Sequence, residues 1–195
     1  MSVGELGVMS SPIQVKRYEE YAYVLDFMPR SRSKLVKNRE GLIVQAIGEM
    51  YFTLLELLAF ENAQLNIGER IYVGKDKREK ILSVLGKLSY DELTQNAKNE
   101  LPNILEKLVL NNESRFVSYF NSLQPLTPRL HALELIPGIG RTMTTHILDE
   151  REERPFDSFA DIEQRTGLKD PAKQIARRLL EEIEGRSRIN IFIKR

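Results

Sequence analysis

The chain has 195 residues, of which 42% are hydrophobic and 29% are charged, and its formal net charge at pH 7 is +1. This composition indicates a globular protein of one or two domains with enough apolar material for a core. With no cysteine and only two histidines, disulfides and zinc sites of the Cys/His type are excluded. Since neither a signal-peptide pattern nor an apolar run of membrane-spanning length is present, we expect a cytoplasmic protein without membrane contact.

The N-terminal part of the chain has the pattern of short strands. Residues 20–28 alternate in polarity, and 42–47, 51–59 and 70–74 are further strand candidates separated by glycines. Strands of this length and spacing indicate a small barrel or sheet. Five aromatic side chains in these segments could stack nucleic-acid bases, but filling of the interior is the favoured interpretation. They are Tyr21, Tyr23, Phe27, Tyr51 and Phe52.

Helical patterns follow the strands. Ser89 and Glu92 form a capping-box signature, so we expect a helix to start near residue 90. Pro102 marks a break or the first turn of a new helix. Thr127 before Pro128 predicts the start of another helix, because threonine is a good N-cap and proline is tolerated at the first helical position.

The sequence Pro137-Gly138-Ile139-Gly140 lies between the apolar residues 133–136 and a helical pattern at 141–151. Proline ends the preceding helix, and the two glycines allow a turn with positive φ and a close approach of the backbone. Because no acidic side chain follows before Asp149, the N–H groups at the start of the next helix form a favourable anion site. We therefore predict that a phosphate binds here. The residues concerned are Pro137, Gly138, Ile139, Gly140, Arg141 and Thr142.

The pattern Leu133-x-x-Ile136-Pro137-Gly138-Ile139-Gly140 resembles the helix-hairpin-helix family. The resemblance implies a hairpin that grips a phosphodiester backbone without reading its sequence, with Ile139 packed inward to hold the turn. It also implies that a monovalent cation can be shared between hairpin carbonyls and the phosphate; no other cofactor is indicated. The alternative is that Pro-Gly-x-Gly is only a tight connection between two helices.

Residues 158–183 resemble a second, degenerate copy of this hairpin. Lys169 stands in the place of the second glycine, and Asp170 stands where an anion should bind. As an N-cap before a proline, Asp170 fits a structural role. We interpret this copy as mainly structural, with Lys169 and Lys173 as peripheral contacts.

Two basic groups lie in predicted loops. The first has five cationic side chains and no acid, so we expect it to contact phosphates, although charge runs often only face solvent. The second includes two acids and therefore has less weight. The first group consists of Arg30, Arg32, Lys34, Lys37 and Arg39, and the second of Lys75, Lys77, Arg78 and Lys80.

The order of segments, from Tyr21 through 65–76, 90–94 and 113–117 to the hairpin, resembles an archaeal family of uncharacterised function called DUF655. The resemblance implies an OB-like domain joined to a helix-hairpin-helix domain that binds nucleic acid. At residues 65–73 the sequence also resembles a segment common in OB-fold barrels. Alternation of isoleucines after residue 188 predicts a last strand that pairs with the N-terminal sheet.

We therefore predict an α+β fold with an N-terminal OB-like small β-barrel, a helical connector and a C-terminal helix-hairpin-helix domain with a final short strand. The boundaries are a flexible tail at 1–12, the β domain at 13–88, the connector at 89–126, the helix-hairpin-helix domain at 127–186 and the strand at 187–195.

These features predict a non-enzymatic, sequence-tolerant nucleic-acid-binding protein, with RNA and DNA both open. The alternative is a protein-interaction adaptor in a translation or replication assembly, which would reuse the same helical pair. A DNA glycosylase is less favoured: Asp157 follows the hairpin as a catalytic candidate, but strands occupy the part of the chain where helices would form the base pocket. P-loop and dinucleotide-binding motifs fail on their glycine spacing.

Overall fold

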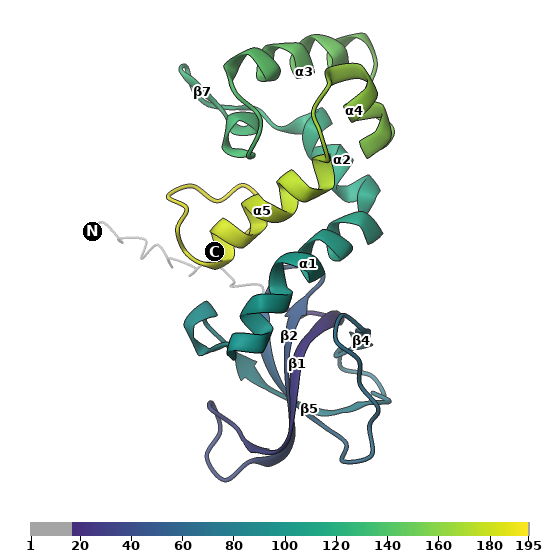
Figure 1. Cartoon of the computed structure of the whole chain (residues 1–195), viewed down its shortest axis with the longest axis vertical. Helices are drawn as coiled ribbons and strands as arrows, with labels where there is room; N and C mark the ends of the chain where they lie inside the picture. The colour runs from purple at the N-terminus through teal and green to yellow at the C-terminus, as the bar shows by residue number, and fades with distance from the viewer. Residues whose placement is uncertain (1–16, 195) are drawn as a thin grey trace, which may run out of the picture.

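The computed structural model describes residues 17–194, with a curled five-stranded sheet at one end and helices at the other (Figure 1). The strand order is β4-β1-β2-β3-β5, and all neighbouring strands are antiparallel. The predicted tail at 1–12 lies outside the described residues. The strands are β1 (Tyr21–Arg32), β2 (Glu40–Gly48), β3 (Leu54–Ala59), β4 (Arg70–Tyr72) and β5 (Ile81–Lys87).

The four predicted strands are confirmed, and β5 is an additional strand that was not predicted from the sequence. β1, β2 and β3 form a meander, and β4 returns to lie beside β1, which is the spatial order of a Greek key. The edges of the curled sheet are β4 and β5, which are not paired with each other. The sheet is therefore a half-barrel with an open seam between its first and last strands.

Both faces of the central strands are buried. One face packs the residues of a small core inside the curl, including Val24, Val44 and Leu57. The other face, including Tyr23 and Leu25, packs in a larger core against the helices. Strands buried on both sides read as nearly continuous apolar runs, as β2 and β3 do.

The helical part begins after β5. Ser89 and Glu92 form the predicted capping box, but it opens only a three-residue turn. The long helix after this turn starts behind Thr94, whose hydroxyl accepts the Ala97 N–H at 3.1 Å, and Pro102 lies inside it rather than at a break. The helical elements are η1 (Tyr90–Glu92), α1 (Gln95–Asn111), α2 (Glu113–Ser122), η2 (Ala132–Leu135), α3 (Arg141–Glu153), α4 (Phe159–Thr166) and α5 (Pro171–Ile183).

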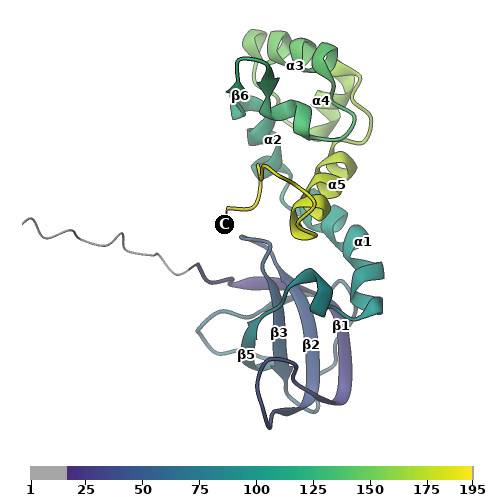
Figure 2. The same cartoon turned by 90° about the vertical axis from the view of Figure 1, so that its left-hand side faces the viewer.

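Helix α1 connects the sheet to the C-terminal helices. It packs on β1, and α5 lies beside it in both views (Figures 1 and 2). The larger core runs without interruption from the sheet through α1 to α5 and Phe192. This shared core holds the sheet and the helices in one arrangement. Within residues 17–194 no helix combines the length and apolar character needed to cross a membrane.

The prediction that a helix starts at Pro128 is wrong. A two-stranded hairpin, β6 (Pro125–Thr127) and β7 (Leu130–His131), leads instead into η2. The Thr127 hydroxyl does not cap a helix but accepts the Arg129 N–H at 3.2 Å, which closes a tight turn.

The prediction of a final strand at 187–195 is also wrong, because residues 187–194 contain no strand. The carboxylate of Glu182 on α5 accepts the N–H groups of Ile191, Phe192 and Ile193 at 2.8, 3.2 and 2.9 Å. Arg178 on the same helix donates to the Ile189 carbonyl. Side chains of α5 thus take backbone groups that a strand ladder would need, and Phe192 packs into the larger core.

Candidate nucleic-acid interface

The first hairpin turn joins η2 to α3. Gly138 has φ +81°, a left-handed conformation that favours glycine. The next residue, Ile139, is only 4% exposed, and its N–H donates to the Ile136 carbonyl at 3.1 Å. Gly140 then caps α3 in an extended conformation. The turn is therefore held by one left-handed glycine and one buried aliphatic side chain.

The start of α3 faces open space. Gly140 is exposed, and a Cβ atom built on it would have no neighbour within 4 Å. The first intrahelical bond joins the Thr144 N–H to the Gly140 carbonyl at 2.9 Å, so the N–H groups of the three preceding helical residues have no partner within the helix. No acidic residue lies in this first turn. The partial positive charge of the helix terminus is thus not neutralised by its own side chains.

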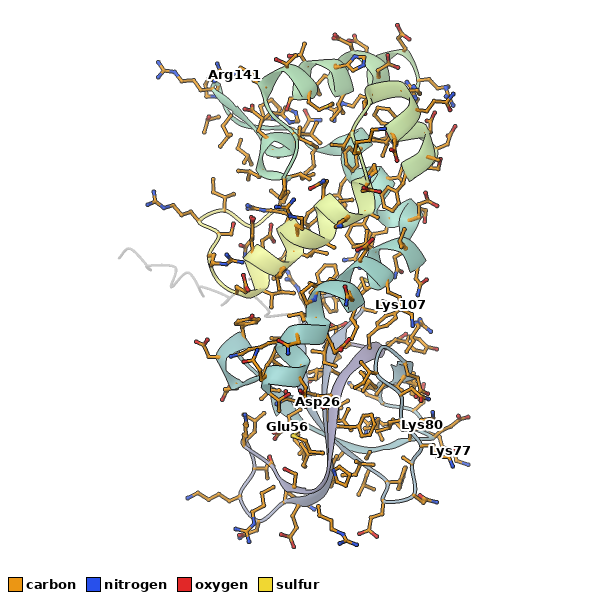
Figure 3. All side chains as sticks on the ribbon, in the orientation of Figure 1. Asp26, Glu56, Lys77, Lys80, Lys107 and Arg141 are labelled. Atoms are coloured by element: carbon orange, nitrogen blue, oxygen red, sulfur yellow. The ribbon has the colours of Figure 1, made fainter. Side chains whose placement is uncertain are left out.

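One face of α3 extends this exposed region. Arg141, Thr142, Thr145 and His146 line a shallow surface hollow, which Asp149 closes one turn further on. Figure 3 shows Arg141 at the end of the molecule farthest from the sheet. The opposite face of α3 is buried through Thr144 and Ile147. The predicted hairpin residues therefore meet at one end of the molecule, with Ile139 buried beneath them.

A second turn, between α4 and α5, has a similar backbone. Gly167 has φ +76°, and Leu168 after it is 3% exposed. Here, however, an acidic residue, Asp170, precedes the next helix at φ +48°, and its carboxylate accepts no hydrogen bond from the N–H groups of the helix start. A Cβ on Gly138 would lie 3.7 Å from Leu168 and 3.5 Å from Gln174 of α5, so the two turns are neighbours.

The cationic loop between β1 and β2 lies at the opposite end of the molecule from α3 (Figures 1 and 2). Arg30 and Arg32 lie at the end of β1 rather than in the predicted loop, and Arg32 forms an exposed ion pair with Glu40 at 3.6 Å. The ammonium group of Lys34 donates to the Glu92 carbonyl at 2.7 Å. Lys37 and Arg39 are exposed and line a surface hollow of about 440 Å³ with Arg32. The structure does not bring these cations together with the hairpin.

Two buried acids of the sheet, which were not predicted from the sequence, hold this loop and the start of α1 respectively. Glu56 on β3 is 1% exposed and accepts the Ser33 hydroxyl and the Lys34 and Leu35 N–H groups, the latter two at 3.1 and 3.3 Å. Asp26 on β1 accepts the Thr94 hydroxyl at 2.6 Å. Figure 3 shows both carboxylates below the start of α1. Their only signal in the sequence is a charged residue within an apolar strand.

The approach to the first turn is organised by His131 and Arg151. Nδ1 of His131 accepts the Leu133 N–H at 3.1 Å and so caps η2. Burial and the nearby Arg151 guanidinium lower the pKa of His131, so the ring is neutral at pH 7. Arg151 itself donates to the Phe120 and Leu123 carbonyls, each at 2.9 Å, and fixes α3 to the end of α2. Both residues therefore stabilise the elements that flank the turn at 137–140.

The glycosylase candidate Asp157 is engaged in local structure. It is exposed and forms an ion pair with Arg154 at 2.5 Å, and its N–H donates to Asp161 at 3.1 Å. The N-cap of α4 is the neighbouring Ser158, whose hydroxyl accepts the Asp161 N–H at 3.0 Å. Within residues 17–194, no three His, Asp or Glu side chains group as metal ligands.

The fold is a mixed α+β arrangement in which a curled antiparallel sheet is joined to a layer of helices. The chain belongs to the family described as "Protein of unknown function (DUF655)", which matches residues 18–194. It is 39% identical over 181 residues to the uncharacterized protein MJ0038 of Methanocaldococcus jannaschii, a match that covers 92% of this chain and 82% of that protein.

The fold is also similar to the crystal structure of Af1531 from Archaeoglobus fulgidus, another DUF655 protein. The TM-score is 0.80 at 39% identity, and the match covers 90% of this chain and 100% of that chain. Family membership and the general architecture are therefore established, and the prediction of a DUF655 relative is confirmed.

Proposed function

We propose that this protein is a non-enzymatic, sequence-tolerant nucleic-acid-binding protein that holds a phosphodiester backbone at the start of α3. The observation that carries the proposal is the exposed first turn of α3, which contains no acidic residue. A Cβ atom built on Gly140 would have no neighbour within 4 Å, so the helix start is open to a ligand. Unpaired N–H groups at a helix start favour a phosphate. Arg141 and Thr142 lie where they can add donors.

The paired turns support the interpretation of the C-terminal part as a helix-hairpin-helix domain. In each, a left-handed glycine and a buried aliphatic residue precede a helix. Contacts from backbone amides to phosphates carry no information about base sequence, so this interface binds without sequence preference. The Greek-key order of the first four strands supports the finer interpretation of the sheet as OB-like.

The proposal assigns a second contact to the loop between β1 and β2. Lys37 and Arg39 supply exposed positive charge there, at the far end of the molecule from the hairpin, and Arg30 adds an exposed cation near the end of β1. A ligand that contacts both regions has to run along the long axis of the protein. The loop therefore contributes to binding of longer nucleic acids rather than to the phosphate at α3.

A monovalent cation shared with that phosphate is part of the proposal. The carbonyl of Ile136 accepts the N–H of Ile139, and that of Gly140 accepts the N–H of Thr144. Each carbonyl oxygen has two lone pairs, so one remains on each for a cation. The cation would add positive charge beside the helix start.

Fluorescence anisotropy of short single- and double-stranded RNA and DNA at two salt concentrations tests the proposal. We expect log affinity for duplex to fall with log salt by about 0.9 per phosphate contact. Gel analysis of the same mixtures should show neither strand cleavage nor base release, with or without magnesium. Absence of binding to all four ligands at low salt, or release of a damaged base that disappears in Asp157→Asn, would contradict it.

A further inference from the structure

A second concave site lies at the open seam of the curled sheet, where β4 and β5 are not paired. It is a pocket of about 330 Å³ whose wall is mainly apolar, with Leu55, Val73 and Val84 among the lining residues. Because β4 ends at Tyr72, the chain leaves the sheet before it could close the barrel against β5. The pocket is thus a consequence of the incomplete barrel.

The rim of this seam pocket is strongly cationic. Four basic side chains and one carboxylate, that of Glu19, line it. The Glu19 oxygens accept the N–H groups of Met50, Tyr51 and Thr53 at 2.9 to 3.1 Å, so this acid is engaged by the turn after β2. The positive charge at the rim therefore attracts an anionic ligand. The basic residues are Arg17, Lys75, Arg78 and Lys87.

An aromatic ring also lies at the rim. Tyr18 is 55% exposed, and the Lys75 ammonium group lies 4.6 Å from the centre of its ring. Aromatic faces bind unpaired nucleic-acid bases by stacking, and every base offers such a face. An apolar wall, an exposed ring and surrounding cations together match a flat base that carries a phosphate.

We propose that the seam pocket binds one unpaired nucleotide of a single strand, with its base against Tyr18 and its phosphates near Lys75 and Lys87. The inference rests on the proposed nucleic-acid binding but concerns a different site. Its volume is at the lower end of ligand pockets, which suits one nucleotide and excludes a duplex. An acidic peptide would satisfy the cations but has no flat apolar face for the ring.

Neighbouring residues of the same loop provide a matched control. Lys77 lies in an adjacent hollow with Lys80 and Glu69, on the side of the sheet labelled in Figure 3. Lys77→Glu therefore changes the same charge without entering the seam pocket. Arg78 is unsuitable for substitution, because its Nε donates to the Gly74 carbonyl at 2.6 Å and holds the loop.

The pocket can be tested directly by methyl NMR of the full chain titrated with adenosine or uridine 5′-monophosphate. We expect shifts of the Leu55, Val73 and Val84 methyl signals that inorganic phosphate at the same ionic strength does not produce. Unmoved methyl signals, or equal shifts with phosphate alone, would overturn the inference. This readout does not depend on the hairpin.

A single-stranded oligonucleotide supplies the second test. Tyr18→Ala should weaken its binding about tenfold, whereas Tyr18→Phe keeps the ring and should not. The double variant Lys75→Glu, Lys87→Glu should make the slope of log affinity against log salt less steep by about 1.4, at about 0.7 per phosphate contact. Lys77→Glu should leave this slope unchanged. Duplex affinity, which we assign to the hairpin and the loop between β1 and β2, should stay unchanged. Equal single-strand binding by all these variants would overturn the pocket while leaving the hairpin proposal intact.

Discussion

The two turns of the C-terminal part share a backbone but differ in the residues between the buried aliphatic side chain and the next helix. At the first turn, Gly140 leaves the start of α3 bare; at the second, Lys169 and Asp170 precede α5. Gly138 and Gly167 have nearly the same φ, and each turn buries one aliphatic side chain. The left-handed glycine is thus common to both turns, whereas the anion binding that we propose depends on the residues after it.

The largest effect on folding should come from the left-handed glycines of both turns. Gly138→Ala and Gly167→Ala should each lower the free energy of unfolding by about 1–2 kcal/mol, because an L-residue is strained at positive φ. Space is not the cause, since the Gly138 Cβ would be at ordinary contact distance. Urea denaturation measures the change. Gly140→Ser, at negative φ, is the control, and equal stability of all three variants would show that the turns do not require a left-handed glycine.

The next largest effect, on the salt dependence of duplex binding, should come from the loop between β1 and β2. Lys37→Ala with Arg39→Ala should make the salt dependence of duplex affinity less steep by about 1.8, at about 0.9 per phosphate contact. Neither change removes the hydrogen bonds that Glu56 makes to the loop. Anisotropy over a salt series provides the slope. An unaltered slope would assign the loop to solubility.

The helices that lead into the two turns are capped differently, by His131 before the first and by Ser158 before the second. Since burial lowers the pKa of His131, the folded protein binds fewer protons than the unfolded chain below the ordinary histidine pKa of about 6.5. The stabilisation that comes from keeping His131 neutral is fully present above the ordinary histidine pKa. It is lost as the pH falls through the lowered pKa of His131 in the folded protein.

Thermal unfolding between pH 7 and 5 tests this difference. His131→Asn keeps an acceptor for the Leu133 N–H but does not titrate, so its melting temperature should fall less on acidification than that of the wild type. A Ser158→Asn variant should retain the wild-type pH dependence. Identical pH profiles for His131→Asn and the wild type would contradict the role of His131.

The smallest effect should come from the second turn. Although the sequence pattern suggests Lys169 and Lys173 as peripheral contacts, Lys169→Ala with Lys173→Ala should leave the salt dependence of binding unchanged, because the negative charge of Asp170 lies at the start of α5. Lys169 already pairs with Glu163 at 3.5 Å. The Lys37 and Arg39 double variant is the matched comparison, since each removes two cations. A decrease of about 0.9 per lysine in the slope of log affinity against log salt would instead identify the second turn as a phosphate site.

Much of the fold could be predicted from local patterns. β2 and β3 were identified because burial on both faces makes them continuously apolar. β5 was missed because this edge strand exposes Leu82 and Val84 and contains a glycine. The last strand was predicted wrongly because its isoleucine alternation is real, but the distant Glu182 takes the backbone N–H groups.

The candidate site was predictable only within one segment. The turn at 137–140 depends on neighbouring residues, so its glycines and proline indicate it directly. The separation of the basic loop from the hairpin depends on how α1 packs between the sheet and α5, which no local pattern encodes. The seam pocket likewise combines residues before β1, after β4 and in β5.

Gly140→Asp tests most directly our proposal that the bare start of α3 binds phosphate. Aspartate is a favoured N-cap, so the variant should fold with unchanged or higher stability, which urea denaturation verifies. Its carboxylate would occupy the anion site. Anisotropy should then show about tenfold weaker binding than for Gly140→Ser, as expected when a charge-assisted contact of about 1.5 kcal/mol is lost. Equal affinity of the two variants would remove the hairpin from the interface.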